Sequence, residues 1–295
     1  MDIVENIIQS ACHSGLRDTY HLVKKHIHEL SDAEVIKILS IHSTEVDQAV
    51  LYNTDYIPSK TVRKSVLEGN YHPQKYFLIS HPHIVWGSDE IEIISNLEVP
   101  HILQFLQTTR VEMSDQDAHR FIRHKQPMVR MEAIYNPSIT KHIREEEYRD
   151  IIESDPSAEV RGRYISVPLY PIDTDLSNRV FNKGTGLEVF ELMSREGAPI
   201  PNDMVEKIVK TGDQDTIYSL VRRSDIPWHP SMERLLKEHN LHILDAVISK
   251  DGYIPDQDTM NKGLQSQVAP IRAIWERKKS RMQELEESMS PQAPM

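Results

Sequence analysis

One pattern of about 28 residues recurs along this chain, and it limits the possible folds more than any other feature of the sequence. Residues 192–209, LMSREGAPIPNDMVEKIV, read as a helix, a glycine turn, Ile-Pro, a polar cap and a second helix. Residues 247–264, VISKDGYIPDQDTMNKGL, repeat the same order. The Ile-Pro pairs at 200, 226 and 254 are 26 and 28 residues apart. Such a period predicts an array of similar units.

Further copies of the pattern fill the rest of the chain. The Ile-Pro pair at 57 lies 143 residues before the pair at 200, and the segments near 84, 112, 140 and 170 each contain a turn, an apolar residue, a polar cluster and a helical run. A second apolar anchor marks the helix before each turn, and its copies start at residues 19, 47, 75, 102, 129, 160, 187, 217, 243 and 271. These ten copies predict an all-α fold, an α-solenoid of about ten two-helix repeats.

Each predicted unit consists of two short amphipathic helices. Within 204–209, apolar residues recur at three- and four-residue spacing, which places them on one helix face. Polar residues just before the helix that follows each turn, as at Ser114 and Asn202, are typical N-caps. Such a unit cannot bury its apolar face alone, so neighbouring units must stack. We therefore expect a single helical-repeat array over 1–288, with the first and last units as caps, and a disordered tail at 289–295.

Charge and composition narrow the class of protein. The net charge of −11 argues against nucleic-acid binding through overall charge, although a local basic face stays open. The single cysteine, Cys12, excludes an internal disulfide and fits a reducing compartment. The N-terminal segment has acidic residues where a signal peptide needs basic ones, and no apolar run is long enough to cross a bilayer. We expect a cytoplasmic protein without membrane association.

Three segments resemble the inner helix of HEAT-type repeats: SDPSAEVRGRY at 154–164, KQPMVRMEA at 125–133 and IPSKTVRKSV at 57–66. That family favours Asp or Pro in the turn, followed by Val-Arg. The unit here is shorter than a HEAT unit, and its length and its G-x-x-I-P turn are similar to ankyrin-like short helical repeats, although the Thr-Pro-Leu-His signature of ankyrin is absent. The resemblance implies a scaffold that binds macromolecules, and it implies no reaction.

Arginines follow the anchor valines or isoleucine in register, at Arg63, Arg130, Arg161 and Arg272. They could form a row of cations for an acidic peptide or a phosphate backbone. They could equally form a ladder in which each guanidinium pairs with an acidic residue of the adjacent unit, because the planar fork of Arg fits a carboxylate. We favour the ladder.

A local basic band is the strongest candidate for a binding surface. Residues 119–130, HRFIRHKQPMVR, contain no acidic residue, and two further arginines follow one repeat later. The candidate cations are Arg120, Arg123, Lys125, Arg130, Arg161 and Arg163. Residues 144–159 are strongly acidic, so the two bands could also simply neutralise each other across the stack.

Tryptophans are the second kind of candidate partner-binding residue. Trp86 and Trp228 lie near predicted repeat turns, and Trp275 lies in the last helix. An exposed Trp is a frequent hot spot for protein binding, whereas packing in the core or the turn is the more common position in such a unit.

No motif for catalysis, metal or cofactor accompanies these surfaces. The fifteen histidines lack an H-E-x-x-H pattern, a cysteine pair or an acidic metal loop, and no Walker, Rossmann, kinase or G-x-S-x-G motif is present. We predict a non-enzymatic scaffold, without metal or cofactor, that binds another protein through its concave second-helix face or its row of turns. The alternative is a solenoid that binds nucleic acid, or processes its bases, with the basic band. Self-association end to end is a third possibility.

Overall fold

The computed structural model describes residues 3–13, 16–108, 112–237 and 240–289, and these residues form helices and connecting turns without any strand. The prediction of an all-α protein is therefore confirmed. Within the same residues, no helix combines the length and the apolar character needed to cross a membrane. Residues 290–295 of the predicted tail lie outside the described residues, and Met289 is the last residue of a helix.

The chain divides into two compact units, Met1–Arg144 and Glu145–Met295. The helices of unit 1 are α1 (Ile3–His13), α2 (Leu16–His26), η1 (Ile27–Glu29), α3 (Asp32–Leu39), α4 (Thr44–Leu51), α5 (Lys60–Glu68), α6 (His72–Ile79), α7 (Ser88–Ser95), α8 (Val99–Thr108), α9 (Asp115–Ile122), α10 (Pro127–Ala133) and α11 (Pro137–Thr140). The helices of unit 2 are α12 (Glu145–Ser154), α13 (Ala158–Ser166), α14 (Thr174–Lys183), α15 (Gly186–Ser194), α16 (Asn202–Thr211), α17 (Gln214–Arg222), η2 (Pro230–Lys237), α18 (Leu241–Ile248), α19 (Gln257–Leu264) and α20 (Ala269–Met289).

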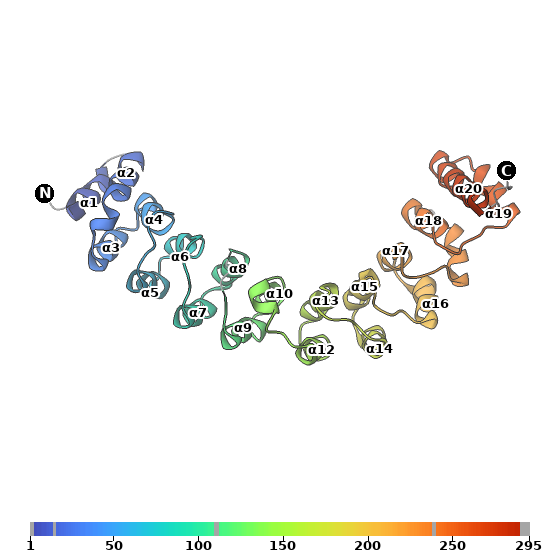
Figure 1. Ribbon diagram of the computed structural model, residues 1–295, viewed down its shortest axis with the longest axis horizontal. Helices are drawn as coiled ribbons and strands as arrows, with labels where there is room; N and C mark the ends of the chain where they lie inside the picture. The colour runs from blue at the N-terminus through green and yellow to red at the C-terminus, as the bar shows by residue number, and fades with distance from the viewer. Residues whose placement is uncertain (1–2, 14–15, 109–111, 238–239, 290–295) are drawn as a thin grey trace, which may run out of the picture. The chain divides into compact units, whose positions relative to one another are not determined.

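In unit 1 the helices pack in two rows (Figure 1). The odd-numbered helices α1 to α9, called the first helices below, contact one another in chain order. The even-numbered helices α2 to α10, called the second helices, do the same, and each first helix also contacts the second helix that follows it. The core therefore lies between the two rows, where Leu78, Phe105 and Phe121 are fully buried.

Unit 2, described by itself, has the same kind of packing. Its second helices α13, α15, α17, α18 and α20 contact one another in this order, while α12 contacts α14 and α16 contacts η2. The segment Pro230–Lys237 forms a 3₁₀ helix at the place of a first helix. Tyr148 and Tyr164 are the largest side chains that are fully buried in this unit.

The N-termini of the first helices follow the sequence pattern, with one correction. Ser114 is the N-cap of α9, as predicted, and its Oγ accepts a hydrogen bond from the backbone N–H of Asp117 at 3.2 Å. At α16 the prediction was wrong, because Pro201 is the N-cap and Asn202 is the first helical residue. The residue two positions before the helix start is apolar and buried at α5, α7 and α9 of unit 1 and at α12 and α14 of unit 2. These residues are Pro58, Trp86, Met113, Ile143 and Ile172. This is the position of a hydrophobic staple, which fixes the angle at which the chain enters a helix.

Candidate binding surfaces

The four cations of the predicted basic band in unit 1 differ in their surroundings. Arg120 on α9 is half-buried, with its Nη2 3.0 Å from Glu92 Oε2 and its Nε 3.6 Å from Asp117 Oδ1. Arg130 is 8% exposed and donates through Nη1 to the carbonyls of His124 and Lys125. Arg123 and Lys125 are exposed. Arg120 and Arg130 are therefore engaged by groups of unit 1.

Arg161 and Arg163, predicted to extend the band, belong to unit 2. Arg161 on α13 forms a bidentate pair with Glu188 on α15, at 2.8 Å for Nε–Oε1 and 3.0 Å for Nη2–Oε2. The hydrogen bond that Arg161 donates to the Glu188 carboxylate raises the pKa of Arg161, so this guanidinium stays charged. Arg163 is exposed on the same helix. The guanidinium of Arg161 is thus bonded to a carboxylate of its own unit.

The repeated arginines share a local role that the sequence did not predict. Arg63, Arg130, Arg161 and Arg272 each donate through Nη1 to a backbone carbonyl five or six residues earlier, at Pro58, Lys125, Asp155 and Ser266. Each therefore fixes the turn before its own helix. The ladder is also present at two of them, because Arg63 pairs with Glu90 at 2.7 Å and Arg161 pairs with Glu188.

The candidate tryptophans take core positions to different degrees. Trp86 is 5% exposed and packs edge-on against Phe105, with 6.0 Å between the ring centroids. Its burial follows from its staple position, and it removes Trp86 from any binding surface. Trp228 is half-buried and packs on Tyr253, with 4.2 Å between the centroids. The sequence analysis left open whether these tryptophans bind a partner or pack in the turn or the core. Trp86 packs in the core.

Sequence reasoning missed a set of buried donors that cap the second helices. A polar residue lies one to three positions after the end of several second helices, and its side chain donates to carbonyls near the end of the second helix one repeat earlier. These residues are His81, Asn136, Arg195, Arg223 and Lys250. Such carbonyls have no partner within their own helix and attract cations through the helix dipole.

Arg195 and Arg223 show how complete this capping is. Arg195 donates to the carbonyls of Ile165, at 2.8 Å, and Tyr170, and Arg223 donates to Ala198 at 2.6 Å. Burial lowers the pKa of Lys250, which donates to Ile226 at 2.8 Å. The sequence does contain a polar residue near the end of several apolar anchors. Which carbonyls its side chain reaches, however, depends on the position of the neighbouring helix.

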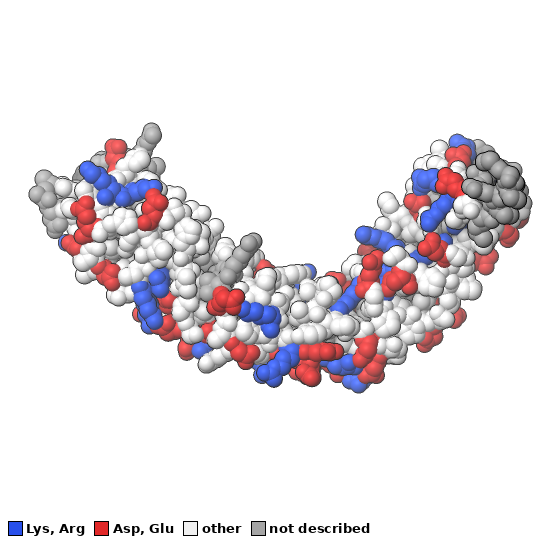
Figure 2. Space-filling view, viewed as in Figure 1, with Lys and Arg blue, Asp and Glu red and all other residues white. Residues whose placement is uncertain are grey.

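Unit 1 carries a surface without charge on its second helices. On α4, α6, α8 and α10, all of which are described, no Lys, Arg, Asp or Glu side chain is exposed. Asp47, Lys75 and Arg130 are buried, and Glu45 and Glu132 are half-buried. The first helices differ, since Lys37, Lys60, Glu92 and Asp115 are exposed. Figure 2 shows mostly white atoms over α6 and α8, and red and blue atoms along the row of α5, α7 and α9.

Aromatic, methionine, proline and neutral polar side chains occupy this surface, which we call the neutral face. Spacings of three or four residues place them on one side of each helix. They are Thr44, Gln48 and Tyr52; Pro73, Tyr76 and Ser80; Pro100, Leu103 and Gln107; and Met128, Met131 and Tyr135. Tyr52, Tyr76, Met128 and Tyr135 are 47%, 56%, 54% and 50% exposed. Large side chains of this kind are enriched where proteins bind one another.

Burial shifts the pKa of several titratable groups on these helices toward the neutral form. His72 and His101 stack, with 3.1 Å between Nδ1 and Nε2. Burial lowers the pKa of His101, and the charges of His72 and Lys75 lower it further. Burial also lowers the pKa of Lys75 itself. Burial raises the pKa of Asp47 to about 7, a shift that the hydrogen bond from Gln74 opposes and Glu45 increases.

The described part of the chain contains no candidate metal site. Within it, no group of three His, Cys, Asp or Glu side chains is placed to hold a metal ion. His81 donates through Nε2 to the Asn53 carbonyl and accepts a hydrogen bond from the N–H of His83 at Nδ1.

Comparison with known proteins adds no relative: no protein-family model, no curated protein and no solved structure matches this chain.

Proposed function

We propose that this chain is an α-solenoid of about ten two-helix repeats that binds another protein through the neutral face of unit 1. The observation that carries the proposal is the row of four successive helices, α4, α6, α8 and α10, that exposes Tyr52, Tyr76, Met128 and Tyr135 and no charged side chain. In a protein of net charge −11, an uncharged row of this length with exposed Tyr and Met side chains is typical of an interaction surface.

Hydrogen bonds between neighbouring repeats support the repeat architecture. The hydrogen-bonded pairs Gln74–Asp47, Arg120–Glu92 and Arg161–Glu188, and the bond from the His81 side chain to the Asn53 carbonyl, join residues that are 27 or 28 positions apart. This separation equals the sequence period, as expected when each two-helix repeat forms hydrogen bonds with the next repeat. The short helices and the Val-Arg turns support a HEAT-like or ankyrin-like scaffold.

The neutral face suits an extended or helical segment of a protein with apolar side chains. Tyr and Met offer large contact areas, and Gln48, Gln107 and Thr44 offer hydrogen bonds to a backbone. A rigid row of packed helices keeps these side chains in fixed places, which lowers the entropy lost on binding. No reaction is required for this role, so we propose a non-enzymatic scaffold.

Nucleic-acid binding, the alternative, has less support. Affinity for nucleic acid comes mainly from cations that neutralise phosphates. Arg120 and Arg161 already neutralise Glu92 and Glu188, and Arg130 is buried against backbone carbonyls. The Arg123, Lys125 and Arg163 side chains remain exposed, but they belong to a chain with an excess of acidic residues.

The proposal is tested by charging the neutral face. The double variant Tyr76→Glu/Met128→Glu places two carboxylates on it, and Thr61→Glu/Gln116→Glu places two on exposed positions of the first helices α5 and α9. Each protein, including the wild type, is cross-linked in native lysate with and without nuclease, and captured proteins are identified by mass spectrometry. We expect one stoichiometric protein that survives nuclease, is retained by the control and is lost with the neutral-face variant.

Two outcomes would contradict the proposal. Equal capture by both variants would place the partner elsewhere. Recovery of nucleic acid that is lost in an Arg123→Glu/Lys125→Glu variant would favour the alternative function.

A further inference from the structure

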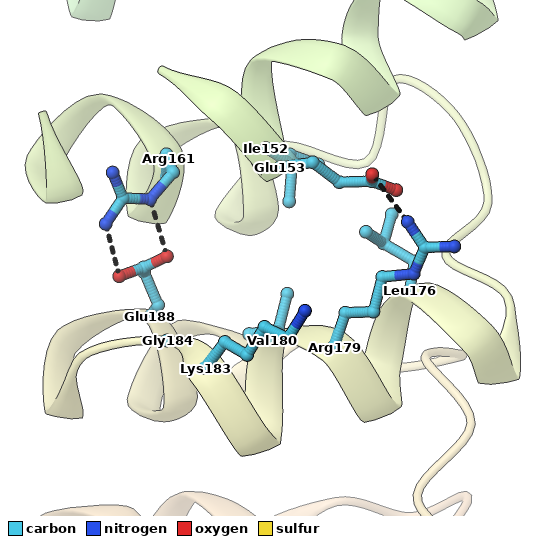
Figure 3. A pocket seen from close by; sticks show the side chains of 9 residues that line it. All are labelled: Ile152, Glu153, Arg161, Leu176, Arg179, Val180, Lys183, Gly184 and Glu188. Atoms are coloured by element: carbon cyan, nitrogen blue, oxygen red, sulfur yellow. Dashed lines mark hydrogen bonds and ion pairs between the residues drawn. The ribbon is translucent and has the colours of Figure 1, made fainter. Parts of the chain in front are cut away.

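A pocket in unit 2 lies outside the proposed protein-binding face. It is formed by α12, α13, α14 and α15, and its volume is about 240 Å³ (Figure 3). Pockets for drug-sized ligands measure roughly 300–1,000 Å³. This one therefore has room for a single small group, such as one amino-acid side chain or a short organic acid.

Two ion pairs form opposite sides of the pocket, as Figure 3 shows. On one side, Arg161 holds Glu188 in a bidentate pair. On the other, Arg179 Nη1 lies 2.7 Å from Glu153 Oε2, and Arg179 Nη2 lies 2.9 Å from Asp175 Oδ2. Both guanidinium groups are therefore already matched by carboxylates.

Glu188 remains ionised in this setting. Burial alone would raise its pKa, but hydrogen bonds from Arg161 and Thr185 outweigh burial and hold the pKa of Glu188 below its ordinary value. The Arg161–Glu188 pair is thus a permanent part of the pocket and carries no net charge.

Lys183 is the remaining cation of the lining. It is the last residue of α14, and Figure 3 shows its Nζ directed into the pocket between the two ion pairs. Among the described residues, no ion pair or hydrogen bond engages this Nζ. A cation in this position is available to an incoming anion.

The floor of the pocket is aliphatic. Ile152, Leu176 and Val180 are 2%, 2% and 4% exposed and line it from α12 and α14. Only a small part of this surface is in contact with water, because the three side chains are almost fully buried. Apolar atoms next to the anionic group would cover it, with a gain of roughly 25 cal/mol per Å² of buried apolar area.

We propose that this pocket binds a carboxylate carried on a short aliphatic group, with the carboxylate on Lys183 Nζ and the aliphatic part on Ile152, Leu176 and Val180. A monoanion fits because Lys183 is the lining cation that no carboxylate of the described residues engages, so it offers one positive charge. A phosphate dianion fits less well, because Glu153 and Glu188 would repel its second charge. The ligand is either a free short-chain acid or an acidic side chain of a bound protein.

The test uses the full chain with isotopically labelled Ile, Leu and Val methyl groups, observed by NMR. The probes are isocaproate, its uncharged amide, a blocked peptide with one glutamate between alanines, and the same peptide with glutamine. We expect isocaproate and the glutamate peptide to shift the methyl signals of Ile152, Leu176 and Val180 in a saturable way. The amide and the glutamine peptide are expected to bind more weakly.

Lys183→Gln should weaken binding of the acids about tenfold, the loss expected for one hydrogen bond to a charged group. The matched control is Lys210→Gln, in the last turn of α16 and also exposed, which should leave the affinity unchanged. Neither change removes a buried contact, so both variants are expected to fold.

The relative affinity of the two acids identifies the source of the ligand. Tighter binding of the peptide points to a protein side chain, and tighter binding of isocaproate points to a free acid. Equal binding of acid and amide, no effect of Lys183→Gln, or no saturable shift with either acid would each overturn the inference. The site lies in unit 2, so any of these results leaves the neutral face of unit 1 to be judged by its own experiment.

Discussion

At the scale of single residues, several buried charges of this protein form ion pairs, and Glu90 and Glu188 are examples. Glu90 on α7 has a side chain that is 1% exposed, and Arg63 on α5 supplies both of its guanidinium contacts, at 2.7 and 3.0 Å. A buried carboxylate without its cation is costly, whereas a neutral group at the same place is not.

We expect Arg63→Met to lower the free energy of unfolding by about 3 kcal/mol, because it leaves the Glu90 carboxylate buried and unpaired. The double variant Arg63→Met/Glu90→Gln should recover part of this loss, since Gln can still accept the hydrogen bond from Gly87 N–H. Urea denaturation followed by circular dichroism measures both. A double variant no more stable than Arg63→Met would show that the ion pair is not the reason.

Asp47 makes the stability of unit 1 depend on pH. Its side chain is buried on α4, Oδ1 accepts a hydrogen bond from Gln74 at 2.7 Å, and Oδ2 has no partner among the described residues. Burial raises its pKa from 3.8 to about 7. Since the folded pKa is the higher one, the folded state binds the proton more tightly. This contribution to stability is complete below about pH 4 and is lost as pH rises through about 7.

Asp47→Asn should remove that loss, because an amide does not ionise. Relative to the wild type, the variant should gain up to about 4 kcal/mol in unfolding free energy between pH 4 and pH 8. Asp215→Asn, at an exposed position on α17, should show no such gain. Denaturation curves at a series of pH values give the comparison, and parallel curves for Asp47→Asn and the wild type would contradict the assignment.

At the scale of helices and turns, close backbone approaches decide which residues are possible. Gly184 joins α14 to α15, and a Cβ atom there would lie 2.4 Å from the carbonyl oxygen of Val180. Gly186, two residues later, begins α15, and a Cβ atom there would meet nothing within 4 Å. The two glycines are close in sequence but differ in surroundings.

Gly184→Ala should therefore destabilise the protein by about 1–3 kcal/mol, because the turn or the end of α14 must shift. Gly186→Ala should be neutral or stabilise by up to about 1 kcal/mol, since Ala favours a helix and restricts the unfolded chain. Thermal unfolding of the two variants side by side tests this. Equal effects of the two changes would show that the close approach at Gly184 does not constrain the turn.

At the scale of the whole molecule, each helix depends on its neighbours in the row. Arg223 joins three successive second helices of unit 2, because it donates to the Leu192 carbonyl near the end of α15 and its own carbonyl accepts a hydrogen bond from Lys250, after α18. In such an array, a local defect weakens the adjacent helices most.

Hydrogen exchange read by mass spectrometry can follow this effect along the chain. We expect Arg223→Met to increase exchange in α15, α17 and α18, because several buried carbonyls lose their donor, and to leave unit 1 unchanged. Arg222→Met, at the adjacent exposed position, should change little. A uniform increase over both units would mean that the chain unfolds as one cooperative body.

The sequence alone was sufficient for the all-α fold. This fold and the N-cap at Ser114 depend on residues a few positions apart, and such local preferences act before any tertiary contact forms. The one misplaced cap, at Asn202, also lies within a single residue of the observed helix boundary. The protein-binding role and the α-solenoid remain proposals.

Only the tertiary structure decided which side chains are free to bind. The Arg120–Glu92 ion pair and the uncharged row on α4 to α10 were not predicted from the sequence, whereas the Arg161–Glu188 pair is the ladder that the sequence favoured. Glu92 lies 28 residues before Arg120, and its contact with Arg120 depends on which sides of the two helices face each other in space. Amphipathic spacing separates a buried side from an exposed one, but the partner that neutralises a charge is fixed only when neighbouring helices pack together.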